Sequence, residues 1–163
     1  MALVAGLGTA LAGVWGCGGP AASEPVRVRA DARALQVVVA NDRTVAILEE
    51  VDRAVDDRLP VRGAELLDRA ALPAARALRE HLEQAQLTTP EGERLRSKAV
   101  AVAARRVRSL ERWRYALARG TVEDLELVDA MREQRAVERE LVALDDELAK
   151  VRPLGRSSPR GAP

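Results

Sequence analysis

Apolar residues recur at every third or fourth position between residues 31 and 152, which is the spacing of one face of an α-helix. Ala, Leu, Arg and Glu, all strong helix formers, dominate this stretch. No run alternates between apolar and polar residues with a period of two, and no Asn-Gly or Asp-Gly hairpin signal is present. The pattern therefore predicts an all-α protein.

Prolines, one glycine and capping residues divide the periodic stretch into four helices. We expect them at residues 31–59, 61–87, 90–119 and 121–152. Pro73 lies inside the second helix and predicts a kink or break after Leu72, because proline lacks the backbone N–H. Thr89 before Pro90 is typical of an N-cap, and Gly120 of a helix end. In the first helix the inward face is predicted to carry Ala34, Val37, Leu48, Val55 and Leu59.

Each helix has one apolar stripe and cannot be stable alone in water. Short loops between helices of equal length, each roughly 40 Å long, favour antiparallel neighbours. The third helix carries nine basic and three acidic residues from position 91 to 119, whereas the fourth carries five basic and ten acidic from 121 to 152. The sequence therefore predicts an antiparallel, up-down-up-down four-helix bundle in which these two helices are neighbours.

Polar residues interrupt the apolar stripes near the middle of the predicted bundle. In an ideal antiparallel arrangement their heights differ by at most about 9 Å. We expect Arg106 to pair with Glu138 and bond to Gln134, and His81 to meet Asn41. This layer either fixes the register of the helices or binds a ligand, unless Arg106 and Glu138 extend to solvent. Its candidate residues are Asn41, Thr44, His81, Arg106, Gln134 and Glu138.

A second set of polar residues forms a basic stripe on the third helix, angled away from its apolar face. It consists of Arg94, Lys98, Arg105, Arg108, Arg112 and Arg119. This stripe either binds an anionic lipid, an anionic cell-wall polymer or an acidic partner, or is a solvated face neutralised by the fourth helix. It lacks the interleaved aromatic residues typical of nucleic-acid binding, so we expect no nucleic-acid partner.

The N-terminal residues 1–16 form a short apolar run that is too short to cross a bilayer and has the length of a signal peptide. The sequence Val14-Trp15-Gly16-Cys17 resembles the lipobox of bacterial lipoproteins. The resemblance implies cleavage before Cys17, a lipid anchor on that residue and a place in the cell envelope. Because Gly18 is not Asp, it also implies the outer membrane, facing the periplasm. We expect residues 17–30 to form a flexible tether and residues 153–163 a disordered tail.

Composition excludes several classes of site. A single Cys and a single His (His81) rule out disulfide frameworks within the chain and multi-histidine metal centres. No Glu-x-x-His pair, Cys-x-x-Cys-His, phosphate loop or nucleophile elbow is present, so we expect no metal, cofactor or catalytic site.

The expected function is a non-catalytic, membrane-anchored interaction, spacer or assembly module of the envelope, with an envelope protein or anionic polymer as partner. The alternative is a bundle that binds a small ligand or cofactor at the polar layer. A homodimer through a patch containing Val39 and Val100 is left open.

Overall fold

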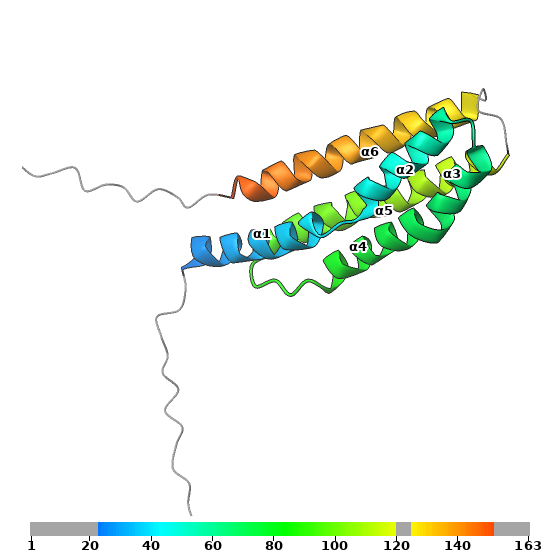
Figure 1. The fold of residues 1–163 in the computed structure, drawn as a ribbon. Coiled ribbons are helices and arrows are strands. Elements are labelled where there is room, and N and C mark those ends of the chain that lie inside the picture. The colour runs from blue at the N-terminus through cyan, green and yellow to red at the C-terminus, as the bar shows by residue number, and fades with distance from the viewer. Residues whose placement is uncertain (1–22, 120–124, 152–163) are drawn as a thin grey trace, which may run out of the picture.

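The computed structural model describes residues 23–119 and 125–151, and within these ranges it is all-α with no strand (Figure 1). Its elements are α1 (Glu24–Ala40), α2 (Thr44–Asp56), α3 (Pro60–Leu66), the π-helical turn η1 (Leu67–Ala71), α4 (Leu72–Gln84), α5 (Pro90–Ala118) and α6 (Leu125–Ala149). No helix in the described ranges is long and apolar enough to span a membrane.

These elements form four arms. The first arm is α1 followed by α2, the second is α3, η1 and α4, and α5 and α6 are the third and fourth. Each arm contacts the next, and α6 returns to contact α1. The start of α1 and the end of α6 lie at the same end of the molecule (Figure 1). The predicted up-down-up-down four-helix bundle is confirmed.

The first arm is not the single helix that the sequence predicts. It begins at Glu24, seven residues before Asp31, so part of the predicted tether is helical. Ser23 at the N-cap position and Pro25 in the first turn are typical of a helix start. The arm then breaks at residues 41–43, where the Asp42 carboxylate accepts hydrogen bonds from the backbone N–H and the hydroxyl of Thr44.

The break shifts the face that the first arm turns to the core. Ala34, Val37 and Leu59, predicted to point inward, are exposed, whereas Ala32 and Leu35 are buried instead. Leu48 and Val55 are buried as predicted. A helical stripe keeps its phase only while the helix is continuous, so one stripe drawn through residues 41–43 fits α2 at Leu48 and Val55 but not α1 at Ala34 and Val37.

The second arm stays helical through Pro73. One π-helical turn, η1, immediately precedes α4, whose second residue is this proline. Proline clashes with the carbonyl four residues earlier, and a wider turn relieves that contact without ending the helix. The predicted irregularity is thus present, as a π turn rather than a break.

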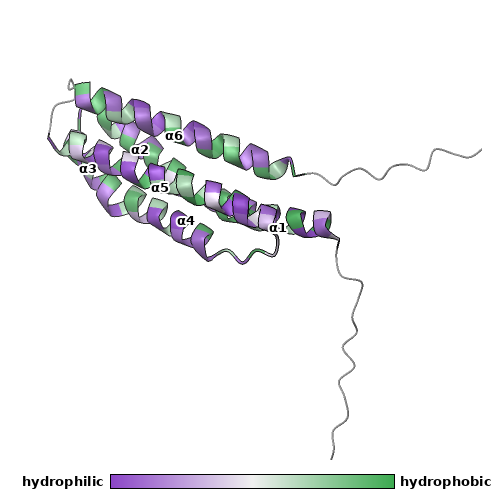
Figure 2. Cartoon of the chain, turned by 180° about the vertical axis from the view of Figure 1, so that it is seen from behind, coloured by the Kyte–Doolittle hydropathy of each residue, from purple (hydrophilic) through white to green (hydrophobic). Residues whose placement is uncertain are grey.

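The third and fourth arms are continuous. Thr89 caps α5 as predicted, its hydroxyl oxygen accepting a hydrogen bond from the Gly92 N–H at 3.0 Å. The helix end predicted at Gly120 and the helix start predicted at residue 121 lie outside the described residues. Hydrophobic and hydrophilic residues are interleaved along these helices (Figure 2), as expected for amphipathic arms.

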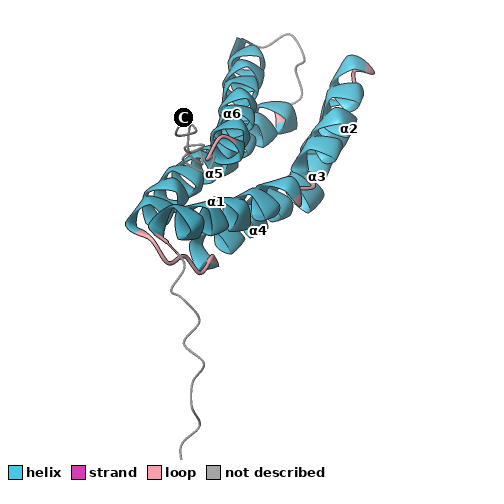
Figure 3. Cartoon of the chain, turned by 90° about the vertical axis from the view of Figure 1, so that its left-hand side faces the viewer, coloured by secondary structure: helices cyan, strands magenta, loops and turns pink. Residues whose placement is uncertain are grey.

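The bundle is closed along α1 but open along α2. The first arm contacts α6 through α1, whereas α2 packs mainly on α3 and η1. Figure 3 shows α2 and α6 diverging from each other. Val39 and Val100, suggested as a dimer patch, are instead partly buried against the core.

Candidate functional site

Arg106 is fully buried in the middle of α5, with a relative exposure of 0%. It lies at the boundary between two apolar clusters of the core. On α5, Ala103 belongs to one cluster and Val107 to the other. A buried guanidinium costs several kcal/mol unless it is paired, so its partners decide what this level of the bundle can do.

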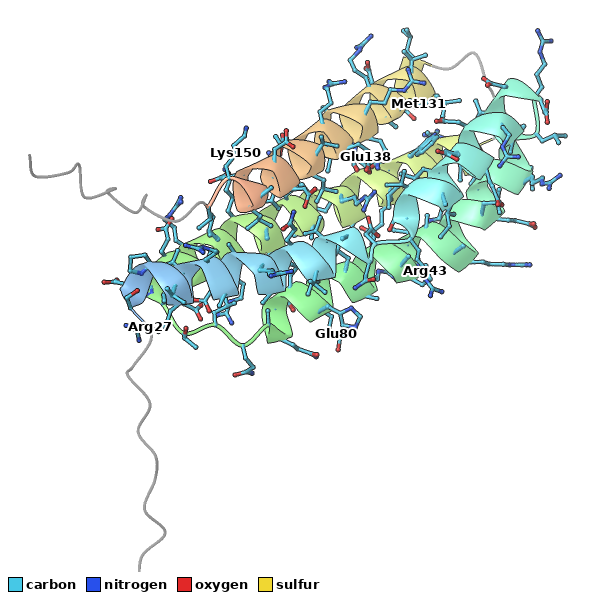
Figure 4. All side chains as sticks on the ribbon, turned by 60° about the vertical axis from the view of Figure 1, so that its left-hand side comes forward. Arg27, Arg43, Glu80, Met131, Glu138 and Lys150 are labelled. Carbon is cyan, nitrogen blue, oxygen red and sulfur yellow. The ribbon has the colours of Figure 1, made fainter. Side chains whose placement is uncertain are left out.

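Two carboxylates from different arms pair with Arg106. Glu138 on α6 accepts a bidentate pair of hydrogen bonds, from Nε at 2.7 Å and from Nη2 at 2.5 Å. Asp42, from the break in the first arm, accepts from Nη1. Figure 4 shows Glu138 on the side of α6 that faces the other helices. The predicted pairing of Arg106 with Glu138 is therefore present, and Asp42 completes it.

Three further side chains extend this network. Gln134 is buried and donates from Nε2 to Glu138 Oε1, while its own Oε1 accepts from the Ser109 hydroxyl. It contacts Glu138 rather than Arg106, contrary to the prediction. Thr44 is buried and bonds to Asp42. We call Asp42, Thr44, Arg106, Ser109, Gln134 and Glu138 the Arg106 cluster.

The Arg106 cluster holds one cation and two carboxylates in a poorly solvated place. Burial raises the pKa of Glu138, and the nearby Asp42 raises it further, although Arg106 opposes both effects. One carboxylate is enough to neutralise one guanidinium, so the cluster holds one carboxylate more than it holds cations.

Asn41 and His81 do not belong to the cluster, which corrects the prediction. Both are exposed, and Asn41 instead caps α1 by donating from Nδ2 to the Val37 carbonyl at 2.9 Å. They line the same open cavity between α1 and α4, of about 480 Å³. Asn41 was placed in the apolar stripe because the sequence pattern did not reveal that α1 ends there.

Three polar residues, Asp31, Asp42 and Ser109, are not among the candidates predicted from the sequence. Asp42 lies in an Asn-Asp-x-Thr segment, which is typical of a helix end followed by a new start. Asp31 is buried on α1 and accepts from the Thr89 N–H at 2.9 Å and the Thr89 hydroxyl at 2.6 Å, and from the N–H and hydroxyl of Thr88. We call this set, with Gly92, the Asp31 clasp.

The basic stripe is largely neutralised. Five of its six members lie in ion pairs, mostly with carboxylates of α6. This agrees with the alternative that the stripe is a solvated face neutralised by the fourth helix. The pairs are Arg94 with Glu91, Lys98 with Glu147, Arg105 with Glu140, Arg112 with Glu133 and Arg119 with Glu126. Arg108 is exposed and has no ion pair within residues 23–119 and 125–151.

A groove runs along the open α2–α6 side, next to the Arg106 cluster. It consists of two adjoining cavities of about 260 and 270 Å³, which share Val45, Glu138 and Val142. Val45 and Val142, on α2 and α6, are 53% and 64% exposed. Trp113 also lines it, and the indole Nε1–H of this side chain is buried without a hydrogen-bond partner among residues 23–119 and 125–151. We call this feature the α2–α6 groove.

The described side chains form no group of three or more His, Cys, Asp or Glu residues that could hold a metal ion. Cys17, the predicted lipidation site, lies outside the described residues. Comparisons of the chain with protein-family models, with curated proteins and with solved structures give no match.

Proposed function

We propose that this chain is a non-catalytic, membrane-anchored module of the bacterial envelope that binds another envelope protein through its α2–α6 side. The observation that carries the proposal is the pair of exposed valines, Val45 and Val142, on opposite lips of a groove between helices. Solvent-exposed apolar side chains flanking a groove are typical of interaction surfaces.

The anchor is proposed from the sequence. The lipobox-like segment ending at Cys17 stands seven residues before Glu24, where α1 begins. Seven residues span at most about 25 Å, so lipid on Cys17 would hold the start of α1 near the membrane surface. The groove lies along α2. Because α2 follows α1 in the first arm, it is farther along the chain from Cys17 than α1 is.

The first experiment tests the anchor. Intact-mass and acyl analysis of the protein extracted from its native membranes should show a chain that starts at an acylated Cys17. A Cys17→Ser variant should leave the membrane fraction. A precursor that keeps residues 1–16, or an unmodified Cys17, would contradict the anchor.

The second experiment tests the interaction surface. A photo-crosslinking amino acid at Val142 should give a discrete heteromeric adduct in intact cells. Val61 on α3 is the matched control, because it is a valine with almost the same exposure, 63% against 64%, outside the groove. Equal crosslinking at both positions, or none at either, would contradict the proposal.

A second candidate function is binding of a small apolar ligand. The unpartnered Trp113 indole in a cavity lined by Leu48 and Met131 favours it. The Arg106 cluster itself is a poorer ligand site, since its buried polar groups already bond to one another.

A further inference from the structure

We propose that the α2–α6 groove binds a single amphipathic helix of the partner protein, with an apolar stripe against the groove floor and lysine or arginine residues along its edges. This inference rests on the proposed function and names the chemistry of the partner.

The dimensions of the groove fit a helix of about four turns. Along α6 its lining extends from Met131 to Asp145, a distance of roughly 21 Å at the rise of an α-helix. The apolar lining residues are Val39, Ala40, Val45, Leu48, Trp113, Met131, Leu141 and Val142. An amphipathic helix with apolar residues at every third or fourth position can contact a floor of this kind.

The charge of the groove favours a cationic helix. Five carboxylates line it, from Asp42, Glu49, Asp52, Glu138 and Asp145, against only two guanidinium groups, from Arg106 and Arg135. Arg106 is already engaged by two of the carboxylates. The others lie on both lips of the groove, on α2 and α6, where basic residues on either side of an apolar stripe would meet them.

Two residues that line the groove each have a buried polar side-chain atom without a hydrogen-bond partner among the described residues. These atoms are the donor Nε1 of Trp113, near one end, and the acceptor Oδ1 of Asp145, near the other. Both atoms are closed to solvent, so the groove wall must move before a partner can supply the missing bonds. The charge and the apolar lining of the groove therefore carry the inference.

Other occupants fit less well. A second copy of this chain would set one acidic groove against another, and like charges at an interface are costly. The C-terminal residues 152–163 carry three arginines, but their sequence, with three prolines and two glycines in twelve residues, lacks the pattern of an amphipathic helix.

The test uses the full chain with Trp15→Phe, which leaves Trp113 as its only tryptophan. The probe is a synthetic helix of about four turns, with leucine at every third or fourth position and lysine at the flanking positions. Titration should shift the NMR signal of the Trp113 indole N–H, and the affinity should fall as salt screens the acidic lips. The same helix with glutamate in place of lysine should bind at least about tenfold more weakly.

Val142→Lys should weaken binding of the lysine helix about tenfold, because it removes an apolar contact and adds a like charge. Val61→Lys, at equal exposure, should change the affinity by less than about twofold. An unchanged indole signal, equal binding of the two helices, or full affinity in Val142→Lys would overturn the proposal. Self-association abolished by Val142→Lys would overturn it in favour of a second copy.

The outcomes separate this inference from the proposed function. If Val142 crosslinks to a partner in cells but the protein does not bind the lysine helix, the helical partner is overturned and the proposed interaction module is still supported. Binding of a neutral long-chain alcohol, but not of either helix, would overturn it in favour of a small apolar ligand. Lysine-helix binding with an unacylated Cys17 would support the groove and contradict only the membrane anchor.

Discussion

The bundle contains two buried polar regions, and they are built on opposite principles. The Asp31 clasp places one carboxylate among four donors supplied by Thr88 and Thr89, and joins α1 to the start of α5. The Arg106 cluster places one guanidinium between two carboxylates and joins the first arm, α5 and α6. In the clasp, every hydrogen bond to Asp31 favours the ionised form of its carboxylate. In the cluster, the carboxylates of Asp42 and Glu138 compete for the single guanidinium of Arg106.

The pKa directions express this difference. Burial alone would raise the pKa of Asp31, but the hydrogen bonds from Thr89 and Thr88 outweigh it and lower that pKa. For Glu138 burial prevails, and the pKa is raised despite Arg106. The clasp is a satisfied joint between α1 and the start of α5, whereas the cluster holds one carboxylate more than it holds cations and borders the α2–α6 groove.

The largest expected effect comes from Arg106→Leu. Removal of the cation leaves Asp42 and Glu138 close together without a counter-charge, which should lower the free energy of unfolding by about 3–5 kcal/mol in urea denaturation. Arg106→Lys keeps a charge but loses the bidentate geometry, and should lie between this variant and the parent. Arg108→Leu, at an exposed position on the same helix, should change stability little. An Arg106→Leu protein as stable as the parent would show that the cluster does not contribute to folding.

Next in size is Gly92→Ala, which tests the clasp. A Cβ at Gly92 would lie 2.4 Å from Asp31 Oδ2 and 2.8 Å from Asp31 Cβ, so the carboxylate must leave its position. We expect a loss of up to about 3 kcal/mol in unfolding free energy. Gly63→Ala is the matched control, because its Cβ would make a tight contact only with the terminal methyl group Cδ1 of Leu117, at 3.1 Å, and would lie at ordinary van der Waals distance, 3.8 Å, from Val51 and Val55. Equal losses in the two variants would contradict a specific role for the clasp.

Much of the fold could be predicted because α5 and α6 are long and unbroken. Both helices bury apolar residues at helical spacing, the pattern on which the four-helix prediction rests: Leu95, Ala103 and Leu110 on α5, and Leu127 and Leu141 on α6. Helical periodicity did not predict the buried face of the first arm correctly. Its break depends on hydrogen bonds within residues 41–44, which carry no apolar signal and shift the phase of everything extrapolated across them.

The candidate site divides in the same way. Arg106, Gln134 and Glu138 lie on unbroken helices, so their inward direction followed from helical spacing. His81 also lies on a helix, but on an exposed face of α4, whose buried residues include Leu78 and Leu82. Asp42 acts from a turn, where spacing gives no information about direction. Asp31 is the first residue of the predicted helix, whereas α1 begins at Glu24 and buries Asp31 on the same face as Leu35.

A smaller effect is expected from Asp31→Asn. The folded-state pKa of Asp31 lies below its unfolded value of about 3.8, so ionised Asp31 stabilises the fold fully above that value and the contribution is lost as pH falls through the folded pKa. The variant should be about 1–2 kcal/mol less stable than the parent at neutral pH. The gap should narrow below pH 4 or so in urea denaturation. Asp68→Asn, at an exposed ion pair, should show neither effect. A gap that is constant with pH would contradict the clasp.

The smallest effect on stability is expected from Glu138→Gln. This variant is the sharpest test of the comparison, because its stability relative to the parent should change with pH in the direction opposite to that of Asp31→Asn. The folded-state pKa of Glu138 lies above its unfolded value of about 4.5, so the parent is favoured below that value and loses stability as pH rises through the folded pKa. Glutamine does not ionise and avoids this loss, although it gives up one bond to Arg106. Relative to the parent, Glu138→Gln should therefore improve as pH rises, and should lie within about 1 kcal/mol of it at neutral pH. Glu133→Gln, on the exposed side of α6, should follow the parent at every pH. If Glu138→Gln and Asp31→Asn both lost stability relative to the parent as pH rose, the two polar regions would be electrostatically alike, and the contrast between them would fail.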